Sequence, residues 1–471
     1  HALRERGGPI RGYHQAALLQ TPAAMDEAGL RSVLQAVVDH HDMLRARLER
    51  PRGDGAGQWS LRVPVPGTVD VASRLVRVDT AATGETALRE VIAEHARAAR
   101  SRLDPDTGDM LRAVWFDAGG DRPGRLLLLI HHLAVDGVSW RVLLPDLAAA
   151  WQDVAAGRTV TPAPVGLPFR RWSHLLGERA KDPVREDELP LWTSILEGGD
   201  PLPLARALDP ERDVAATSRQ LSLTLPADRT APLLGRVPAA FGATVNDVLL
   251  TALALAVADW RRRRTDGPSP GTSVLADLEG HGRNEELAGN ADLSRTVGWF
   301  TSVVPVRLDP GAVDLADALA GGPALDEAVA RIKEHLAALP VAGIGHGLLR
   351  YLNPVTGPEL ARRPEPQIQF NYLGRFGVPE ATDWSWAAEA EAAEPGDDPE
   401  TPMSHALAVN CLTEDRSGGP EFVASWSFAS GVLTEEAVGD LAETWFRVLE
   451  ALVDRARALA APLRTAEENP A

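Results

Sequence analysis

The feature that most constrains this chain is an apolar run that ends in two histidines and a tight turn. Residues 126–130 are all leucine or isoleucine, which predicts a buried β-strand. His131 and His132 follow directly. The Asp-Gly pair at 136–137 then predicts a turn, and Ser139 is a candidate N-cap for a helix. Because histidine can exchange a proton near neutral pH, a strand with this ending can hold a base rigidly beside a cleft.

A histidine pair alone also has a purely structural explanation, and the chain carries an internal control for it. His40-His41 follows residues 27–38, whose apolar spacing predicts an amphipathic helix. We interpret that earlier pair as no more than the end of a helix. The pair at 131–132 differs because a buried strand precedes it and ordered turn and helix signals follow it.

Composition excludes several classes of function. The net charge is −18, which disfavours nucleic-acid binding because phosphate backbones reward basic surfaces. Lys181 and Lys333 both lie in polar helical surroundings, so a pyridoxal enzyme, which needs a Schiff-base lysine, is not expected. The apolar run at 248–258 is too short to span a bilayer. Cys411 is the single cysteine, which rules out an internal disulfide and predicts a cytoplasmic protein.

The pattern along the chain predicts two α/β halves. No signal-peptide pattern is present, and the start at His1 indicates an excised segment of a longer protein. Proline and glycine gather between the halves, and Pro145 is expected to kink or split its helix. We predict strands at 110–116, 125–130 and 219–225, helices at 83–100, 140–156, 171–181 and 245–264 with Thr244 as a cap, and an exposed acidic loop at 389–401. We predict an N-terminal lobe at 1–175, a linker at 176–215, a C-terminal lobe at 216–455 and a tail at 456–471.

Several motifs of this chain resemble those of one family. The run that begins at His131 resembles the His-His-x-x-x-Asp-Gly motif of the condensation-domain superfamily of nonribosomal peptide synthetases, and Val138-Ser139-Trp140 resembles its epimerization branch. Later stretches resemble further family motifs in the expected order: Glu279-Gly280-His281-Gly282-Arg283, residues 295–301, residues 340–347 more loosely, and residues 370–376. The first family motif is only partly matched at 9–14, and Val304 and His346 stand where the family often has tyrosine.

The resemblance implies a fold and a mechanism. The fold would be α/β, with two chloramphenicol-acetyltransferase-like lobes in a V-shaped pseudo-dimer and a tunnel between them. The activity would be cofactor-independent epimerization, from L to D, at the Cα of an aminoacyl or peptidyl thioester. We expect His132 and Glu279 to lie on opposite faces of that carbon and to be the catalytic pair. Two proton carriers in opposite protonation states predict a bell-shaped pH profile.

Other residues receive supporting roles from the same resemblance. Asp136 is expected either to form an ion pair, with Arg295 as one candidate, or to act as a plain turn residue. Asn371 and Tyr372 would line the site, although Tyr372 can equally be a core residue. We interpret His405 as structural, within a strand pattern at 404–409. His131 is expected to orient the turn, and Trp140, His281 and Arg283 to order the loops; no metal ligand is expected.

The resemblance also implies partners and leaves rivals open. The substrate would be carried on the phosphopantetheine arm of a carrier protein domain, with a downstream condensation domain as a second partner; the domain would have no cofactor of its own, and neither nucleic acid nor a membrane is expected. A condensation domain that forms peptide bonds fits His132 equally well but leaves Glu279 and Trp140 unexplained. A silent carrier-docking module is another alternative. A metal hydrolase using His131, His132 and Asp136 is disfavoured because adjacent strand residues point to opposite faces.

Overall fold

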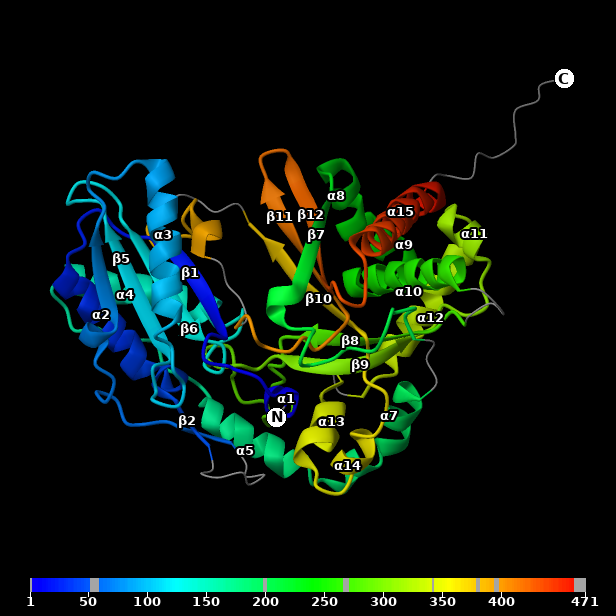
Figure 1. Ribbon diagram of the computed structural model, residues 1–471, viewed down its shortest axis with the longest axis horizontal. Coiled ribbons are helices and arrows are strands. Elements are labelled where there is room, and N and C mark those ends of the chain that lie inside the picture. Colours follow the sequence, from blue (N-terminus) through cyan, green and yellow to red (C-terminus); the bar gives the residue numbers. More distant parts are fainter. Residues whose placement is uncertain are drawn as a thin grey trace.

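The computed structural model describes residues 2–50, 59–197, 201–265, 271–340, 343–377, 382–393 and 398–460. The chain forms two lobes, each built around its own β-sheet, and the lobes lie side by side in Figure 1. The N-terminal lobe holds a four-stranded sheet of order β1-β6-β5-β4, and the C-terminal lobe holds a six-stranded sheet of order β7-β12-β11-β10-β8-β9. A small β2-β3 sheet accompanies the first lobe.

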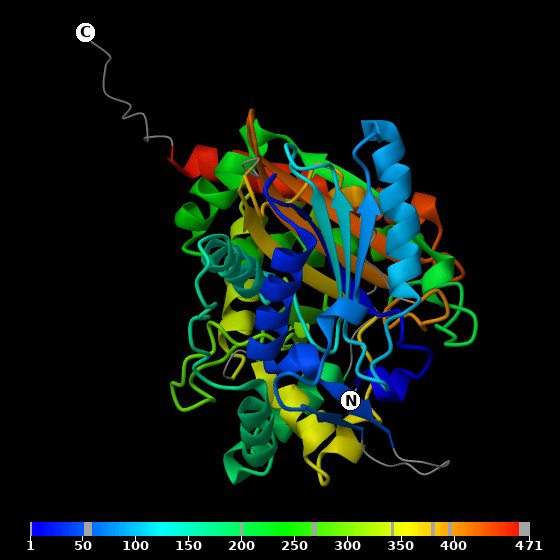
Figure 2. The ribbon, with the colours of Figure 1, turned by 90° about the vertical axis from the view of Figure 1, so that its left-hand side faces the viewer.

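The apolar run of the sequence becomes β6, an inner strand of the N-terminal sheet. Its alternate residues face different layers of the lobe: Leu128 packs in one apolar cluster with α2 and α4, whereas Leu127 and Leu129 pack in another with α3. Figure 2 shows these helices around the sheet. A strand buried on both faces has no polar alternation, which explains the continuous apolar run. The strands are β1 (His14–Gln20), β2 (Arg47–Glu49), β3 (Ser60–Arg62), β4 (Leu75–Asp79), β5 (Leu111–Asp117) and β6 (Arg125–His131).

The helices predicted for this lobe are confirmed within a few residues. The structure has α1 (Ala2–Arg6), α2 (Glu27–His40), α3 (Glu85–Arg100) and α4 (Trp140–Ala155). Pro145 lies inside α4 but does not split it. Leu143 and Leu147 are buried in the cluster that α4 shares with α2, and this packing holds the helix together across the missing N–H.

The segment predicted as a linker is largely ordered structure. It contains the end of α5 (Phe169–Arg179), which confirms the expected helix there, and also α6 (Pro183–Glu186) and α7 (Leu189–Leu196). Trp192 on α7 is fully buried in the core of the C-terminal lobe. The part of this region around α7 therefore belongs to the C-terminal lobe rather than to an open connection.

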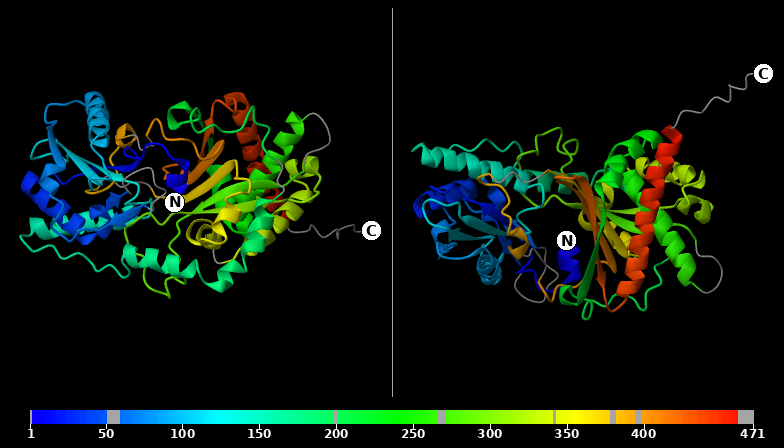
Figure 3. Two further views of the ribbon diagram at one scale, coloured as in Figure 1. Left: turned by 60° about the horizontal axis from the view of Figure 1, so that its bottom comes forward. Right: turned by 90° about the horizontal axis from the view of Figure 1, so that it is seen from above.

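The C-terminal lobe is organised around α10 (Val245–Arg264), which is buried along most of its length. Thr244 caps it as predicted: Asp247 N donates to Thr244 Oγ1 at 3.1 Å, and Thr244 N donates to Asp247 Oδ2 at 2.7 Å. Helix α15 lies on the side of the sheet away from the N-terminal lobe (Figure 3). The other helices are α8 (Ala227–Leu234), α9 (Arg236–Phe241), α11 (Leu315–Leu319), α12 (Ala324–Ala337), α13 (Ile344–Gly347), α14 (Gly357–Leu360) and α15 (Glu435–Ala460). The strands are β7 (Ser218–Leu225), β8 (Val274–Gly280), β9 (Ser302–Leu308), β10 (Ile368–Phe376), β11 (Leu407–Arg416) and β12 (Gly419–Ala429).

A segment of the second half crosses over to the N-terminal sheet. Trp384 N donates to Gln20 O at 2.8 Å, and Ala387 N donates to Leu18 O at 2.9 Å, so the segment runs along β1. Glu389, the first residue of the loop that we expected to be exposed, is buried and pairs with Arg125 at 2.7 Å. The prediction of an exposed loop is therefore wrong at its start, because a carboxylate from one half neutralises an arginine of the other; residues 394–397 lie outside the described part of the chain.

Two further expectations concern the end of the chain and membranes. Helix α15 continues to residue 460, and Ala456 is buried, so the tail expected from 456 is helical over its first five residues; residues 461–471 lie outside the described part. Among the described helices, none is by itself long and apolar enough to cross a bilayer; the segments Ala227–Phe241 and Val245–Arg264 reach that length and apolarity only together, across a bend of 93°.

Candidate active site

His132 occupies an aromatic cradle at the end of β6. Its ring stacks on Tyr13, with centroids 4.6 Å apart and planes at 13°, and lies 4.7 Å from the ring of Trp299. The backbone holds the same place, because His132 N donates to Tyr13 O at 2.9 Å. Burial disfavours the charged imidazolium and lowers the pKa of His132 below its usual 6.5, against the opposing charge of Asp136. Burial therefore favours the neutral imidazole of His132, which is the form that can accept a proton.

Gln15, a residue that the sequence analysis missed, contacts the imidazole directly. Its Nε2 lies 3.1 Å from His132 Nε2, and its Oε1 accepts from Trp140 Nε1 at 2.8 Å. β1 runs antiparallel to β6 with Gln15 opposite Ile130, and this register brings the amide to the histidine turn. No local signal marks Gln15 as functional, because the contact joins positions 117 residues apart. Trp140 does more than order a loop, because its indole fixes this amide.

His131 has the structural surroundings expected of it. The side chain is fully buried, its Nε2 donates to Ile10 O at 2.7 Å, and its Nδ1 accepts from Leu133 N at 3.1 Å. Burial lowers the pKa of His131 to about 4. With both ring nitrogens bonded to backbone, His131 fixes the turn and faces away from Gln15.

Asp136 is the centre of a buried network that joins the two halves of the chain. Arg283 donates to both of its carboxylate oxygens, at 2.7 and 3.0 Å, and Phe300 N donates to Oδ2 at 3.0 Å. Ser139 donates to Oδ1 through its N–H and its hydroxyl, each at 2.8 Å. The hydroxyl of Ser139 is thus used by Asp136 and does not cap α4. Arg283 therefore does more than order a loop, and the suggestion of Arg295 as the partner of Asp136 is wrong.

Arg295 pairs elsewhere, in the neighbourhood of the other histidine pair. Its Nη2 donates to Asp146 Oδ1 at 2.6 Å, and His41 Nε2 lies 2.9 Å from Asp146 Oδ2. Asp146 lies on α4 and contacts both His41, at the end of α2, and Arg295 of the C-terminal half. His41 therefore serves packing between helices, in agreement with the structural interpretation of that pair.

Glu279 lies near the end of β8 and accepts a hydrogen bond from an uncharged side chain on a neighbouring strand. Gln369 on β10 donates from Nε2 to Glu279 Oε2 at 2.7 Å. Burial disfavours the carboxylate and raises the pKa of Glu279 above its usual 4.5, and the Gln369 hydrogen bond opposes this. Sequence reasoning missed Gln369, although its position two residues before Asn371 predicts that the two share a strand face.

The loop after Glu279 passes so close to Phe300 that only glycine fits at position 282. Gly282 has φ of +65°, and a Cβ at that position would lie 1.7 Å from Phe300 O. The tight passage brings Arg283 to Asp136. His281 accepts from Arg283 N through its Nδ1 at 3.1 Å, which is the ordering role expected of it.

A histidine–aspartate pair lies next to Glu279. His405 Nε2 lies 2.8 Å from Asp277 Oδ2, and Asp277 precedes Glu279 by two residues on the same face of β8. We expected His405 to lie within a strand, but it lies just before β11. Its charge lowers the pKa of Glu279. Its interpretation as a purely structural residue is therefore incomplete. His346, whose pKa burial lowers to about 4, also feels the charge of Asp277.

The structure separates Asn371 from Tyr372. Asn371 is buried and shares a face of β10 with Gln369, toward Glu279. Tyr372 points to the other face, where it packs against the core of the C-terminal lobe and its hydroxyl lies 3.2 Å from Thr413 Oγ1. Of the two alternatives for Tyr372, the structure therefore favours the core residue.

His132 and Glu279 are linked by one short segment. Trp299 contacts the His132 ring, and Val303 is the register partner of Glu279 in the antiparallel β8-β9 pair. Four residues span at most about 14 Å between their Cα atoms. Asp136 acts electrostatically on both groups, because its charge raises the pKa of each. His132 and Glu279 therefore belong to one neighbourhood at the junction of the lobes.

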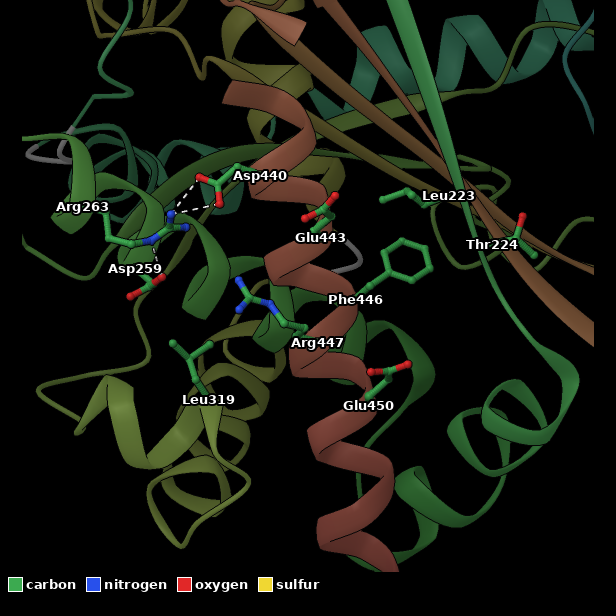
Figure 4. A pocket seen from close by; sticks show the side chains of 10 residues that line it. All are labelled: Leu223, Thr224, Asp259, Arg263, Leu319, Asp440, Glu443, Phe446, Arg447 and Glu450. Atoms are coloured by element: carbon green, nitrogen blue, oxygen red, sulfur yellow. Dashed lines mark hydrogen bonds and ion pairs between the residues drawn. The ribbon is translucent and has the colours of Figure 1, made fainter. Parts of the chain in front are cut away.

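A separate groove lies on the outer surface of the C-terminal lobe. It has a volume of about 710 Å³ and is shown in Figure 4. Helices α10 and α15 line it, and Arg263 pairs there with Asp440 at 2.8 Å. It contains none of the residues that surround His132 or Glu279. Across the described ranges, no group of three or more histidine, cysteine, aspartate or glutamate side chains is placed to hold a metal ion.

Comparisons with known proteins agree with the motifs. A family model described as the condensation domain matches residues 8–467. The chain is 33% identical over 468 residues to a component of the linear gramicidin synthase of Brevibacillus parabrevis, a match that covers 98% of this chain and 6% of that protein. It is 36% identical over 437 residues to chondramide synthase cmdD of Chondromyces crocatus, covering 91% of this chain and 10% of that protein. The chain thus spans a tenth or less of the length of these relatives.

A solved structure covers the whole fold. The epimerization domain from the third module of tyrocidine synthetase B matches with a TM-score of 0.81 and 27% identity, over 97% of this chain and 96% of that one. This likeness confirms the predicted α/β fold class of two chloramphenicol-acetyltransferase-like lobes, while the tunnel between them stays a prediction. Motifs, fold and family match point the same way, and the chain belongs to the condensation domain family.

Proposed function

We propose that this domain inverts the Cα of an aminoacyl or peptidyl thioester from L to D without a cofactor of its own. His132 and Glu279 are the two proton carriers. One removes the Cα proton, the thioester carbonyl takes up the electron pair as an enolate, and the other returns a proton to the opposite face. The observation that carries the proposal is Glu279 itself, a half-buried carboxyl whose pKa is raised by desolvation and which feels the charge of Asp136 from the histidine turn.

The directions of the two pKa shifts support this division of labour. Burial lowers the pKa of His132 and raises the pKa of Glu279, so both environments favour the neutral side chain. A neutral imidazole accepts a proton and a neutral carboxyl donates one. A neutral His132 with a neutral Glu279 holds the same total number of protons as an imidazolium with a carboxylate. Desolvation favours the uncharged of these two states. His132 as base and Glu279 as acid is therefore the starting state that we expect for the first inversion.

General physical contributions supply the rate. A positioned base or acid gives about 10²- to 10⁴-fold. Fixing the thioester beside both groups converts a bimolecular encounter into an intramolecular one, which lowers the barrier by up to several kcal/mol. Donors aimed at the enolate oxygen add about 3 to 4 kcal/mol. Asn371, on the Glu279 face of β10, is a candidate donor.

The substrate would arrive on the phosphopantetheine arm of a carrier protein domain. The likeness to an epimerization domain supports this partner, and a downstream condensation domain would receive the inverted product. Because the chain carries a net charge of −18, an acidic carrier must dock on a local basic or apolar patch rather than be drawn by the overall field.

Peptide-bond formation is the alternative activity. His132 serves it equally well, since it can assist an amine that attacks a thioester. Peptide-bond formation gives no role to the half-buried carboxyl of Glu279. A carrier-docking module without catalysis would need neither group.

The decisive experiment uses an L-aminoacyl carrier in D₂O. Chiral analysis and mass spectrometry of the released amino acid should report inversion together with one deuterium at Cα. Glu279→Gln should abolish inversion while the circular dichroism spectrum and thermal midpoint remain. Peptide-bond formation from two loaded carriers without deuterium uptake would establish condensation instead. If the substrate does not react although the carrier still binds, the domain would be a docking module.

A further inference from the structure

The contact between Gln15 and His132 has a direction that the neighbouring indole determines. A tryptophan Nε1–H is a donor only, so the Gln15 atom 2.8 Å from Trp140 Nε1 must be the amide oxygen. The other end of the amide, its NH₂ group, therefore faces His132 Nε2 at 3.1 Å. An NH₂ group can only donate, so the ring nitrogen that it faces must accept.

We propose that Gln15, oriented by Trp140, is a positioning residue that keeps the lone pair of His132 on Nε2. This inference rests on the proposed function, because it gives the lone pair a use: Nε2 is the atom that would take the Cα proton. The Gln15 N–H occupies the place of that proton. When substrate enters, its Cα–H replaces the amide hydrogen, and the imidazole is already in the required tautomer.

Gln15 is the side chain that contacts Nε2 of the imidazole, while backbone groups of His132 and Val135 also favour a protonated ring. Nδ1 is buried and has no hydrogen bond of good geometry among the described residues, and the ring faces are covered by Tyr13 and Trp299. Among charged and titratable groups, Asp136 favours the imidazolium and His14 disfavours it. Neither contacts Nε2, whereas Gln15 does.

The same chain of contacts gives a physical role to Trp140. It begins α4, Gln15 lies on β1, and His132 follows β6. Without the indole N–H, the Gln15 amide can rotate by half a turn and present its oxygen to Nε2. An oxygen there would hold a proton on Nε2 and move the lone pair to the buried Nδ1.

The test replaces the amide with a carboxylate of the same shape. In Gln15→Glu, one oxygen still accepts from Trp140 and the other faces His132 Nε2 as an anion. The pKa of His132 should then rise by about one to three units, and Nε2 should carry the proton at neutral pH. Nitrogen-15 NMR of histidine-labelled protein reads both quantities, with the His132 signal assigned through His132→Asn. Trp140→Phe should shift the tautomer the same way by a smaller amount.

Controls separate positioning from damage to the fold. Trp260→Phe removes an indole N–H that donates to Ala437 O, remote from His132, and should leave the His132 signal unchanged. Gln15→Leu tests whether the fold tolerates loss of the amide. Unchanged pKa and tautomer of His132 in folded Gln15→Glu would overturn the proposal.

Kinetics then connect the tautomer to the reaction. Once the pKa of His132 exceeds the pH, each further unit lowers the fraction of neutral imidazole about tenfold. Gln15→Glu should therefore lower kcat at neutral pH in proportion to that fraction, with KM for the loaded carrier unchanged. A wild-type domain that inverts no substrate but shows the expected NMR response would refute the proposed function and leave the positioning of His132 standing. Full kcat in a variant whose Nε2 is protonated would refute the link between them.

Discussion

The two proton carriers of the proposed mechanism are held in different ways, and the difference explains how they would work as a pair. His132 lies between two aromatic rings and meets one amide, whereas Glu279 lies at a strand end with an amide and an imidazole-carboxylate pair beside it. Desolvation dominates in both places but acts in opposite directions, lowering the pKa of the imidazole and raising that of the carboxyl. Burial therefore brings the proton affinities of two chemically unlike groups together.

Proton affinities that lie closer together would suit the proposed inversion, which uses each group once as a donor or acceptor. A strong mismatch would leave one group permanently protonated and the other permanently bare. The lobes also differ in what fixes the carrier: aromatic packing orients a ring in the N-terminal lobe, while hydrogen bonds across β8 and β10 orient a carboxyl in the C-terminal lobe. Asp136 and Arg283 tie the two arrangements into one network.

The largest expected effect separates the two carriers by the face of Cα that each one serves. His132→Asn and Glu279→Gln should each reduce inversion by about 10²- to 10⁴-fold. Each variant should still exchange the Cα proton for deuterium in the one enantiomer whose proton faces the carrier that remains. Incubating L- and D-aminoacyl carriers separately in D₂O should therefore show opposite enantiomer preferences for the two variants.

Exposed residues provide a matched control for this comparison. His174 and Glu178 lie on the exposed face of α5, and His174→Asn and Glu178→Gln should leave inversion and exchange at wild-type rates. If both site variants exchange the same enantiomer, or neither exchanges any, the two-carrier mechanism is contradicted even though both residues matter.

The sequence predicted the local frame of the site better than its connections. The run at 126–130, the Thr244 cap and the split into two α/β halves follow from short-range spacing, so these predictions agree with the structure. Gln15 and Gln369 were missed because neutral amides carry no signal until strand register brings them beside a titratable group. The mistaken partner of Asp136 has the same origin. Arg283 and Arg295 both follow Glu279 closely in the sequence, and only the close approach of Gly282 to Phe300 shows that Arg283 is the one that reaches Asp136.

Stability should separate the two arginines that this choice involved. Arg283 and Asp136 are 6% and 3% exposed, whereas Arg295 is 28% exposed. Arg283→Met leaves a buried carboxylate without its partner and should lower the free energy of unfolding by about 3 to 5 kcal/mol. Arg295→Met should cost about 1 kcal/mol or less, because water screens this pair and Asp146 retains His41. Urea denaturation of both variants measures the difference, and equal losses would contradict the central place given to Asp136.

The structural histidine should reveal itself through pH rather than through catalysis. The pKa of His131 is about 4 in the folded protein and near 6.5 when the chain is unfolded. Between these values the unfolded chain binds a proton that the folded chain does not, so stability falls as pH falls. The contribution is about 2 kcal/mol between pH 6.5 and 5. His131→Gln should remove this part of the pH dependence, as measured by urea denaturation at both pH values.

Two comparisons guard this measurement. His174→Gln, on the exposed face of α5, should leave the pH dependence unchanged. His346 also has a pKa of about 4, so the wild-type protein should lose more stability than one histidine explains, and His131→Gln should remove only its own share. A variant with the full wild-type pH dependence would show that His131 is not the buried neutral group described here.

The smallest expected effect tunes Glu279 without removing it. The Gln369 N–H stabilises the carboxylate and lowers its pKa against the larger, opposing effect of burial. Gln369→Leu removes that donor, so the pKa of Glu279 should rise by about one unit. Since the protonated carboxyl is the proton donor in the proposed first inversion, the alkaline limb of the pH profile should move upward by the same amount, whereas Gln220→Leu on the exposed face of β7 should leave it in place. A limb that stays fixed or moves downward would mean that some other group donates the proton, and the two lobes would then contribute one carrier and one bystander rather than a matched pair.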